Sequence, residues 1–130
     1  MAKNGLPEMV KYYVTQLSGD RADDAWHALV ELGPAALPHA IHAFEAQSEL
    51  PVAIALIRVA SEYRSKDALP FFIALLAAQD GNTWKTALDG IVSLGDESAV
   101  TRLLVASETL GNEKLPWVEE AIAQIKARAG

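Results

Sequence analysis

The chain has no cysteine in its 130 residues. This absence excludes disulfide bonds, metal sites built on thiolates and a cysteine nucleophile. Aromatic residues are also few, with three each of Trp, Tyr and Phe, although 51% of the residues are hydrophobic. A core of this composition is filled mainly by Ala, Leu and Ile, which favours helices over sheets. We therefore predict an all-α fold.

Long apolar runs and clusters of positive charge are missing as well. No run reaches the roughly 18 apolar residues of a transmembrane helix, and the N-terminus lacks the apolar segment of a secretory signal. Lys and Arg number 11 against 17 Asp and Glu, which gives a net charge of −6. Phosphate backbones are bound by clustered Lys and Arg, so we expect no nucleic-acid binding. We expect a cytoplasmic protein, away from membranes, whose acidity favours basic protein partners.

Motifs of catalysis are absent too. The sequence has no Gly-rich phosphate loop, no Gly-x-Ser-x-Gly turn and no His-Glu-x-x-His helix. We therefore expect neither an enzyme nor a cofactor.

What the sequence does have is a recurring Leu-Pro step. It occurs at Leu6-Pro7, at Leu37-Pro38 after 31 residues, and at Leu69-Pro70 after a further 32. A period of this size is typical of a repeat protein in which one helical hairpin is copied along the chain. Proline is tolerated in the first turn of a helix, so each step marks a helix start. We call the helices that follow these steps the B helices, and those between them the A helices.

Apolar columns recur in the register that this step defines, with the i, i+3, i+4, i+7 spacing of a buried helical stripe. The B-helix columns are Leu6, Leu37, Leu69 and Val100; Met9, Ala40, Phe72 and Leu103; Val10, Ile41, Ile73 and Leu104; and Tyr13, Phe44, Leu76 and Ser107. The A-helix columns repeat every 31 residues and begin with Ala25, Leu56 and Ala87. The pattern predicts eight antiparallel helices, over residues 5–18, 20–32, 35–47, 51–63, 67–79, 82–94, 98–109 and 116–128.

Helix boundaries carry their own signals. Gly33 and Gly95 each follow a Leu, where the end of a helix favours a residue with positive φ. The middle repeat has Ser61–Lys66 at this point, so we expect its helix to be extended. We expect the N-caps near Asn4, Ala35, Asp67 and Ser98.

The segments Ala25–Gly33 and Ala87–Gly95, with the apolar residues that follow them, resemble HEAT repeats of the short bacterial form. The resemblance covers nearly the whole chain. It implies a right-handed α-α superhelix, or α-solenoid, that forms a single domain over residues 1–130. It also implies that the B helices line a concave, partner-binding side.

Three columns of the B helices lie outside the core stripe and carry aromatic, apolar or small residues where a solvent-facing column would be charged. Exposed groups of this kind are typical of a binding patch. The alternative is that the middle B helix is buried on both sides. We predict partner binding at Tyr12, His39, His42, Phe71, Leu75 and Arg102.

Other clusters have two interpretations. His39, His42 and Glu45 share one helix face with a spacing open to a metal ion, but HEAT-like metal enzymes use His-Glu dipeptides, which the chain lacks. We predict no metal site. The acidic residues Asp20, Asp23 and Asp24 suit either a solvated helix start or an acidic docking site. Trp84 and Trp117 are expected to seal neighbouring A helices rather than to bind a ligand.

These observations predict a non-enzymatic protein-binding module, either a monomer or a weak dimer. Its most concrete form is an immunity protein or antagonist that neutralises a basic toxin. The alternative is an accessory or maturation factor for an enzyme system, as in bilin-lyase-type HEAT proteins. A third possibility, a HEAT-like nucleic-acid glycosylase, is opposed by the charge balance.

Overall fold

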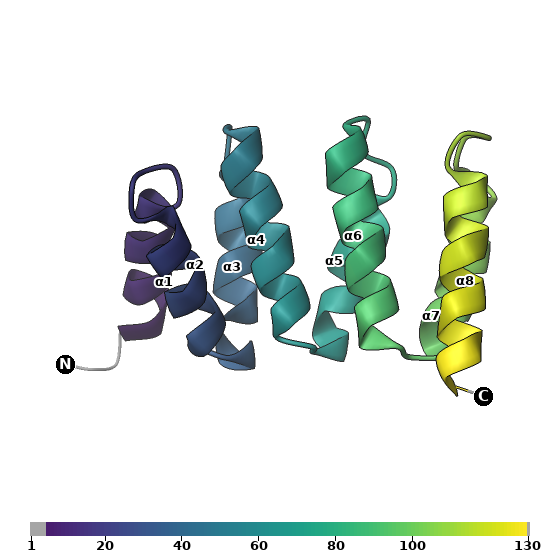
Figure 1. Ribbon diagram of the computed structural model, residues 1–130, viewed down its shortest axis with the longest axis horizontal. Helices are drawn as coiled ribbons and strands as arrows, with labels where there is room; N and C mark the ends of the chain where they lie inside the picture. The colour runs from purple at the N-terminus through teal and green to yellow at the C-terminus, as the bar shows by residue number, and fades with distance from the viewer. Residues whose placement is uncertain (1–4, 130) are drawn as a thin grey trace. The chain divides into compact units, whose positions relative to one another are not determined.

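The protein is all-α, as predicted. The computed structural model describes residues 5–129, and within this range it contains eight α-helices, two short 3-10 helices and no strand. The helices group into two compact units, Met1–Arg64 and Ser65–Gly130, and their order along the chain can be followed in Figure 1. No helix in the described range is long and apolar enough to cross a membrane. The superhelical stacking of the repeats stays a prediction.

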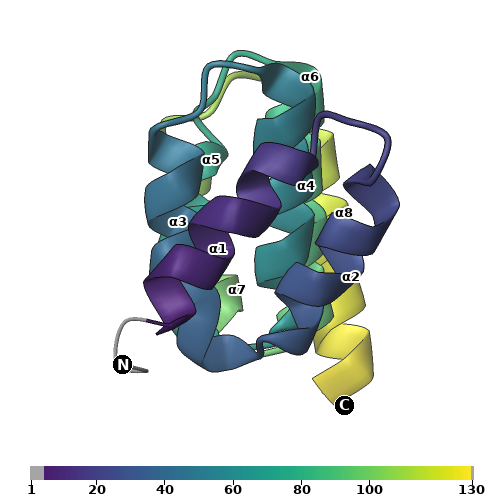
Figure 2. The same ribbon diagram turned by 90° about the vertical axis from the view of Figure 1, so that its left-hand side faces the viewer.

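The first unit is a two-layered arrangement of four helices. Helix α1 contacts α2 and α3, and α4 in turn contacts both α2 and α3, so α1 with α3 and α2 with α4 form the layers (Figure 2). Leu29, Leu56 and Ile57 are at most 1% exposed between the layers. The elements are α1 (Gly5–Gln16), α2 (Ala22–Glu31), η2 (Pro34–Ala36), α3 (Leu37–Glu45) and α4 (Leu50–Glu62).

The second unit repeats this arrangement, with α5 and α7 in one layer and α6 and α8 in the other. Phe72, Ile91 and Ile125 are fully buried at its centre. The last carbonyls of a helix lack hydrogen-bond partners within the helix. At the C-cap of α5, Lys114 Nζ donates a hydrogen bond of 2.8 Å to the carbonyl of Leu76. The elements are η3 (Lys66–Ala68), α5 (Leu69–Leu75), α6 (Gly81–Leu94), α7 (Ser98–Ser107) and α8 (Leu115–Ala129).

The helix starts differ in detail from the expected ones. The turns before α3 and α5 are 3-10 helices, so Ala35 and Asp67 lie inside these turns and do not cap α-helices. The start of α7 is held by Asp96, which accepts hydrogen bonds from the hydroxyl of Ser98 at 2.7 Å and from its backbone N–H at 3.2 Å. These bonds stabilise the carboxylate and lower the pKa of Asp96. Asn4 lies outside the described residues.

The ends of three A helices share a residue with positive φ. Gly33 has φ of 84° and Gly95 has φ of 62°, as expected. Arg64 lies 31 residues from each and also has positive φ, at 51°. The expected helix extension in the middle repeat is therefore wrong, because α4 ends at Glu62 and Arg64 has a positive φ where glycine stands in the other two repeats.

Two residues of the predicted core stripe are exposed. Met9 is 41% exposed and Leu104 is 53% exposed, so their assignment to the core was wrong. Val10 takes the core position of α1, and Leu103 takes that of α7. Helix α1 packs mainly on α2 and α3, and helix α7 mainly on α5 and α8; Met9 and Leu104 lie on faces that these neighbours do not cover.

Tyr63 links the end of α4 to α2. Its hydroxyl donates a hydrogen bond of 2.6 Å to the carbonyl of Leu29, and the residue is only 6% exposed. Burial disfavours the charged tyrosinate and raises the pKa of Tyr63 from 10.0 to about 12. The neutral phenol is thus the form that the fold stabilises.

Tyr63 should make the protein sensitive to alkali. Because its pKa is higher in the folded chain, its contribution to stability is complete below the unfolded value of 10.0 and is lost as the pH rises toward about 12. At neutral pH, we expect Tyr63→Phe to lower the free energy of unfolding by about 0.5–1.5 kcal/mol. Urea unfolding at a series of pH values should show this difference shrinking above pH 10. A difference that stayed constant would contradict the proposed linkage.

Candidate functional site

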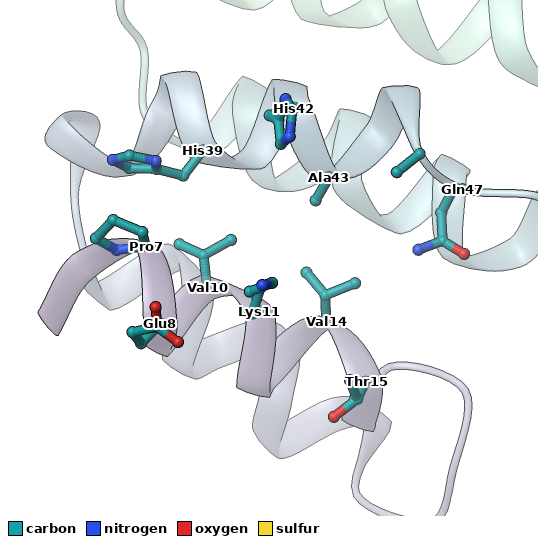
Figure 3. Close-up of a pocket in the computed structure, with 11 residues that line it drawn as sticks. Pro7, Glu8, Val10, Lys11, Val14, Thr15, His39, His42, Ala43 and Gln47 are labelled. Atoms are coloured by element: carbon teal, nitrogen blue, oxygen red, sulfur yellow. The ribbon is translucent and has the colours of Figure 1, made fainter. Parts of the chain in front are cut away.

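A groove lies between α1 and α3 in the first unit. Its volume is about 420 Å³, within the range of roughly 300–1,000 Å³ that is typical of ligand pockets. Figure 3 shows it from the side, with α1 below and α3 above. It is lined by Pro7, Glu8, Val10, Lys11, Val14, Thr15, His39, His42, Ala43, Ala46 and Gln47.

The floor of the groove is apolar. Val10 and Val14, one turn apart on α1, point toward α3, and Ala43 points back from α3 (Figure 3). Val10 is only 2% exposed and continues into the core of the unit. The methyl groups of Ala43 and Ala46 are too short to fill the space opposite the valines. Small residues on α3 therefore explain why a groove exists here.

The two rims are polar but differ in charge. Glu8, Lys11 and Thr15 come from α1, whereas His39 and His42 come from α3 and Gln47 from the segment that follows it. Glu8 and Lys11 are both exposed, and neither takes part in an ion pair within the described part of the chain. The α1 rim thus offers one carboxylate and one ammonium group, while the α3 rim has two imidazoles, an amide and no carboxylate.

The structure brings two of the six predicted binding residues into this groove, His39 and His42. Tyr12 is 60% exposed but follows Lys11 around α1 and lines a separate hollow of about 80 Å³ beside the start of α2. Its ring makes an edge contact with that of Tyr13, with centroids 5.3 Å apart. Tyr12 therefore faces a different part of the surface from the two histidines.

The other three predicted residues belong to the second unit. Phe71 and Leu75 are half-buried on α5, and Arg102 is exposed on α7. The ring of Phe71 contacts that of Phe72, with centroids 5.7 Å apart. Partner binding at these residues stays a prediction.

The structure also shows where the possible metal ligands, the acidic residues and the two tryptophans lie. No three His, Asp or Glu residues in the described range approach closely enough to hold a metal ion, and this includes His39, His42 and Glu45. The carboxylate of Asp23 lies 3.8 Å from the ring of His27 in a solvent-exposed pair. Trp84 and Trp117 do join α6 to α8, with ring centroids 5.8 Å apart.

The sequence-based prediction missed most of the groove. Glu8, Lys11 and Ala43 lie in the three columns outside the core stripe but were not named as binding residues. Val14, Thr15, Ala46 and Gln47 lie outside those columns. One feature of the sequence could have indicated the groove. Ala43 and Ala46 stand three apart on a B helix, and such small residues leave space beside a neighbouring helix.

No protein-family profile, curated protein or solved structure matches this chain. The residues of the groove and their chemistry are therefore the basis for a functional assignment.

Proposed function

We propose that the protein is a non-enzymatic interaction module that binds a protein partner in the groove between α1 and α3. The observation that carries this proposal is the apolar floor of Val10, Val14 and Ala43 between two polar rims. An apolar floor supplies affinity by excluding water from the side chains of the partner, and polar rims supply selectivity. Grooves between helices are a common way of binding a protein segment.

The net charge of −6 bears on the kind of partner. An excess of acidic groups speeds the encounter with a positively charged protein, and this speed depends on the total field more than on single contacts. We therefore favour an antagonist that masks a basic protein, such as a toxin. The alternative is an accessory factor that assists an enzyme. The activity of the partner distinguishes them, because an antagonist lowers it and an accessory factor raises it.

The partner can be identified by cross-linking from within the groove. A photo-reactive amino acid is placed at Ala43 and, as a control, at Ala123, which is exposed on α8 in the other unit. Cross-linking in cells of the native host should join a protein to the Ala43 variant but not to the Ala123 variant. The joined protein is then purified for measurements of affinity and activity.

Filling the groove should abolish binding of that partner. Ala43→Phe places a ring in the space of about 420 Å³, which has room for it, so we expect the fold to be kept. Affinity should fall at least about tenfold, equivalent to about 1.4 kcal/mol, because the segment of the partner loses its place on the floor. Titration calorimetry measures the change, and circular dichroism checks the helical content.

Ala123→Phe is the matched control, since it adds the same ring at an exposed helix position that is not among the residues lining the groove. It should leave the affinity unchanged. Equal affinities for the wild type and a correctly folded Ala43→Phe variant would exclude the groove as the binding site.

A further inference from the structure

We propose that the groove binds an apolar segment in one direction, with a cationic side chain opposite Glu8 and a carboxylate opposite Lys11. This inference rests on the proposed function and specifies the chemistry of the partner. It begins from the α1 rim, where the two charges stand three residues apart on one helix. Side chains with this spacing are neighbours on the helix surface, with Cβ atoms about 5–6 Å apart.

Both charges are available to a partner. Glu8 and Lys11 could pair along the helix at this spacing, yet neither forms an ion pair with the other or with any other group in the described range. Both side chains are exposed at the edge of the groove, beside the buried Val10. A segment lying on the valine floor would therefore have Glu8 near one of its residues and Lys11 near another.

The opposite rim carries no carboxylate, so Glu8 and Lys11 determine which charges of a partner are favoured along the groove. His39, His42 and Gln47 provide imidazole and amide groups but no carboxylate, so Glu8 is the only carboxylate among the described residues that line the groove. A cationic side chain is consequently favoured at the Glu8 end. An acidic side chain is favoured beside Lys11, toward the middle of the groove, where His42 lies on the facing helix.

The apolar floor alone does not set a direction. Burial of apolar surface is non-directional, so a segment and its reverse would gain similar free energy from Val10, Val14 and Ala43. Charged groups at the rim do distinguish them, because the wrong direction places like charges together. The order Glu8 then Lys11 thus selects one orientation. It also allows a partner that is basic overall to present one acidic residue in the groove.

Exchange of the two charges tests this inference directly. The double variant Glu8→Lys/Lys11→Glu keeps the net charge of −6 and leaves the floor unchanged. Random dodecapeptides displayed on phage are selected separately on the wild type and on this variant, and each pool is depleted on Ala43→Phe to retain groove binders. Circular dichroism confirms the fold of α1, whose first turn loses a favourable carboxylate.

We expect the two selections to give opposite charge orders. Peptides from the wild type should carry a basic and an acidic residue around apolar ones, and should bind the exchanged variant at least about tenfold more weakly. Peptides from the exchanged variant should show the reverse order and the reverse preference. A neutral variant, Glu8→Gln/Lys11→Gln, should bind both sets with similar affinity.

The outcomes separate this inference from the proposed function. Groove binders with no charge order, or with the same order on both proteins, would overturn the inference and leave the groove as a binding site. A selection that yields no peptide sensitive to Ala43→Phe would overturn the proposed function itself.

Discussion

Leu103→Ala should lower the free energy of unfolding by about 2–5 kcal/mol, whereas Leu104→Ala should change it by less than about 0.5 kcal/mol. The two leucines are adjacent on α7, yet Leu103 is fully buried and Leu104 is 53% exposed. Truncating Leu103 removes apolar surface from the core of the second unit and leaves a cavity. Truncating Leu104 removes atoms that already contact water. Urea unfolding of the two variants measures the difference.

The Leu103→Ala and Leu104→Ala variants serve as controls for each other. Both substitutions remove the same atoms from the same helix, so their effects on helix propensity cancel. Similar losses at the two positions would mean that Leu104 is covered in solution, for example by a second copy of the chain. A dependence of that loss on protein concentration would identify such an association.

Gly33→Ala should lower the free energy of unfolding by about 1–3 kcal/mol. Gly33 has φ of 84° and ψ of 177°, a backbone conformation that is essentially restricted to glycine. An added Cβ would meet no atom within 4 Å, so the cost comes from the backbone alone and not from a clash. The variant should therefore unfold at a lower urea concentration. The slope of its unfolding free energy against urea concentration, the m-value, should be unchanged.

Gly19→Ala provides the comparison. Gly19 does not have positive φ, and its added Cβ would likewise meet nothing within 4 Å. Because alanine restricts the unfolded chain, this substitution should be neutral or stabilise the protein by up to about 1 kcal/mol. Equal effects of the two substitutions would show that the turn at Gly33 tolerates a side chain, and that its positive φ is not required.

Much of the fold could be predicted from the spacing of residues along the sequence. The 31-residue register placed Gly33 and Gly95 at helix ends and put Leu29, Ala60 and Ile91 in one buried column. Helices are local structures, so an apolar period of 3.6 residues and a proline in the first turn suffice to locate them. Arg64 shows where prediction from local sequence fails. Its side chain gave no hint of positive φ, and the chain turns there because the next helix must begin, not because the residue favours it.

The binding groove was less accessible to sequence reasoning. His39 and His42 were singled out, but Val14 and Gln47 were not, and Tyr12 proved to face a different hollow. A groove depends on how far two helices lie apart and on how each is rotated about its axis. A rotation of one residue moves a side chain by about 100° around the helix. Repeat alignment assumes the same rotation for every copy, whereas Val10 is buried and Met9 exposed in α1, and Leu103 is buried and Leu104 exposed in α7.

The sequence by itself determined the helices, their order, the residues of most core columns and the acidity of the surface, because each follows from local spacing or from composition. Tertiary structure alone decided that Leu104 is exposed while Leu103 is buried, that Arg64 adopts positive φ, and that Glu8 and Lys11 border an apolar groove opposite His39 and His42. The physical reason is the same in each case. Exposure, backbone turns and grooves arise from the distance and rotation between packed helices, and these are settled only when the side chains of several helices compete for the same space.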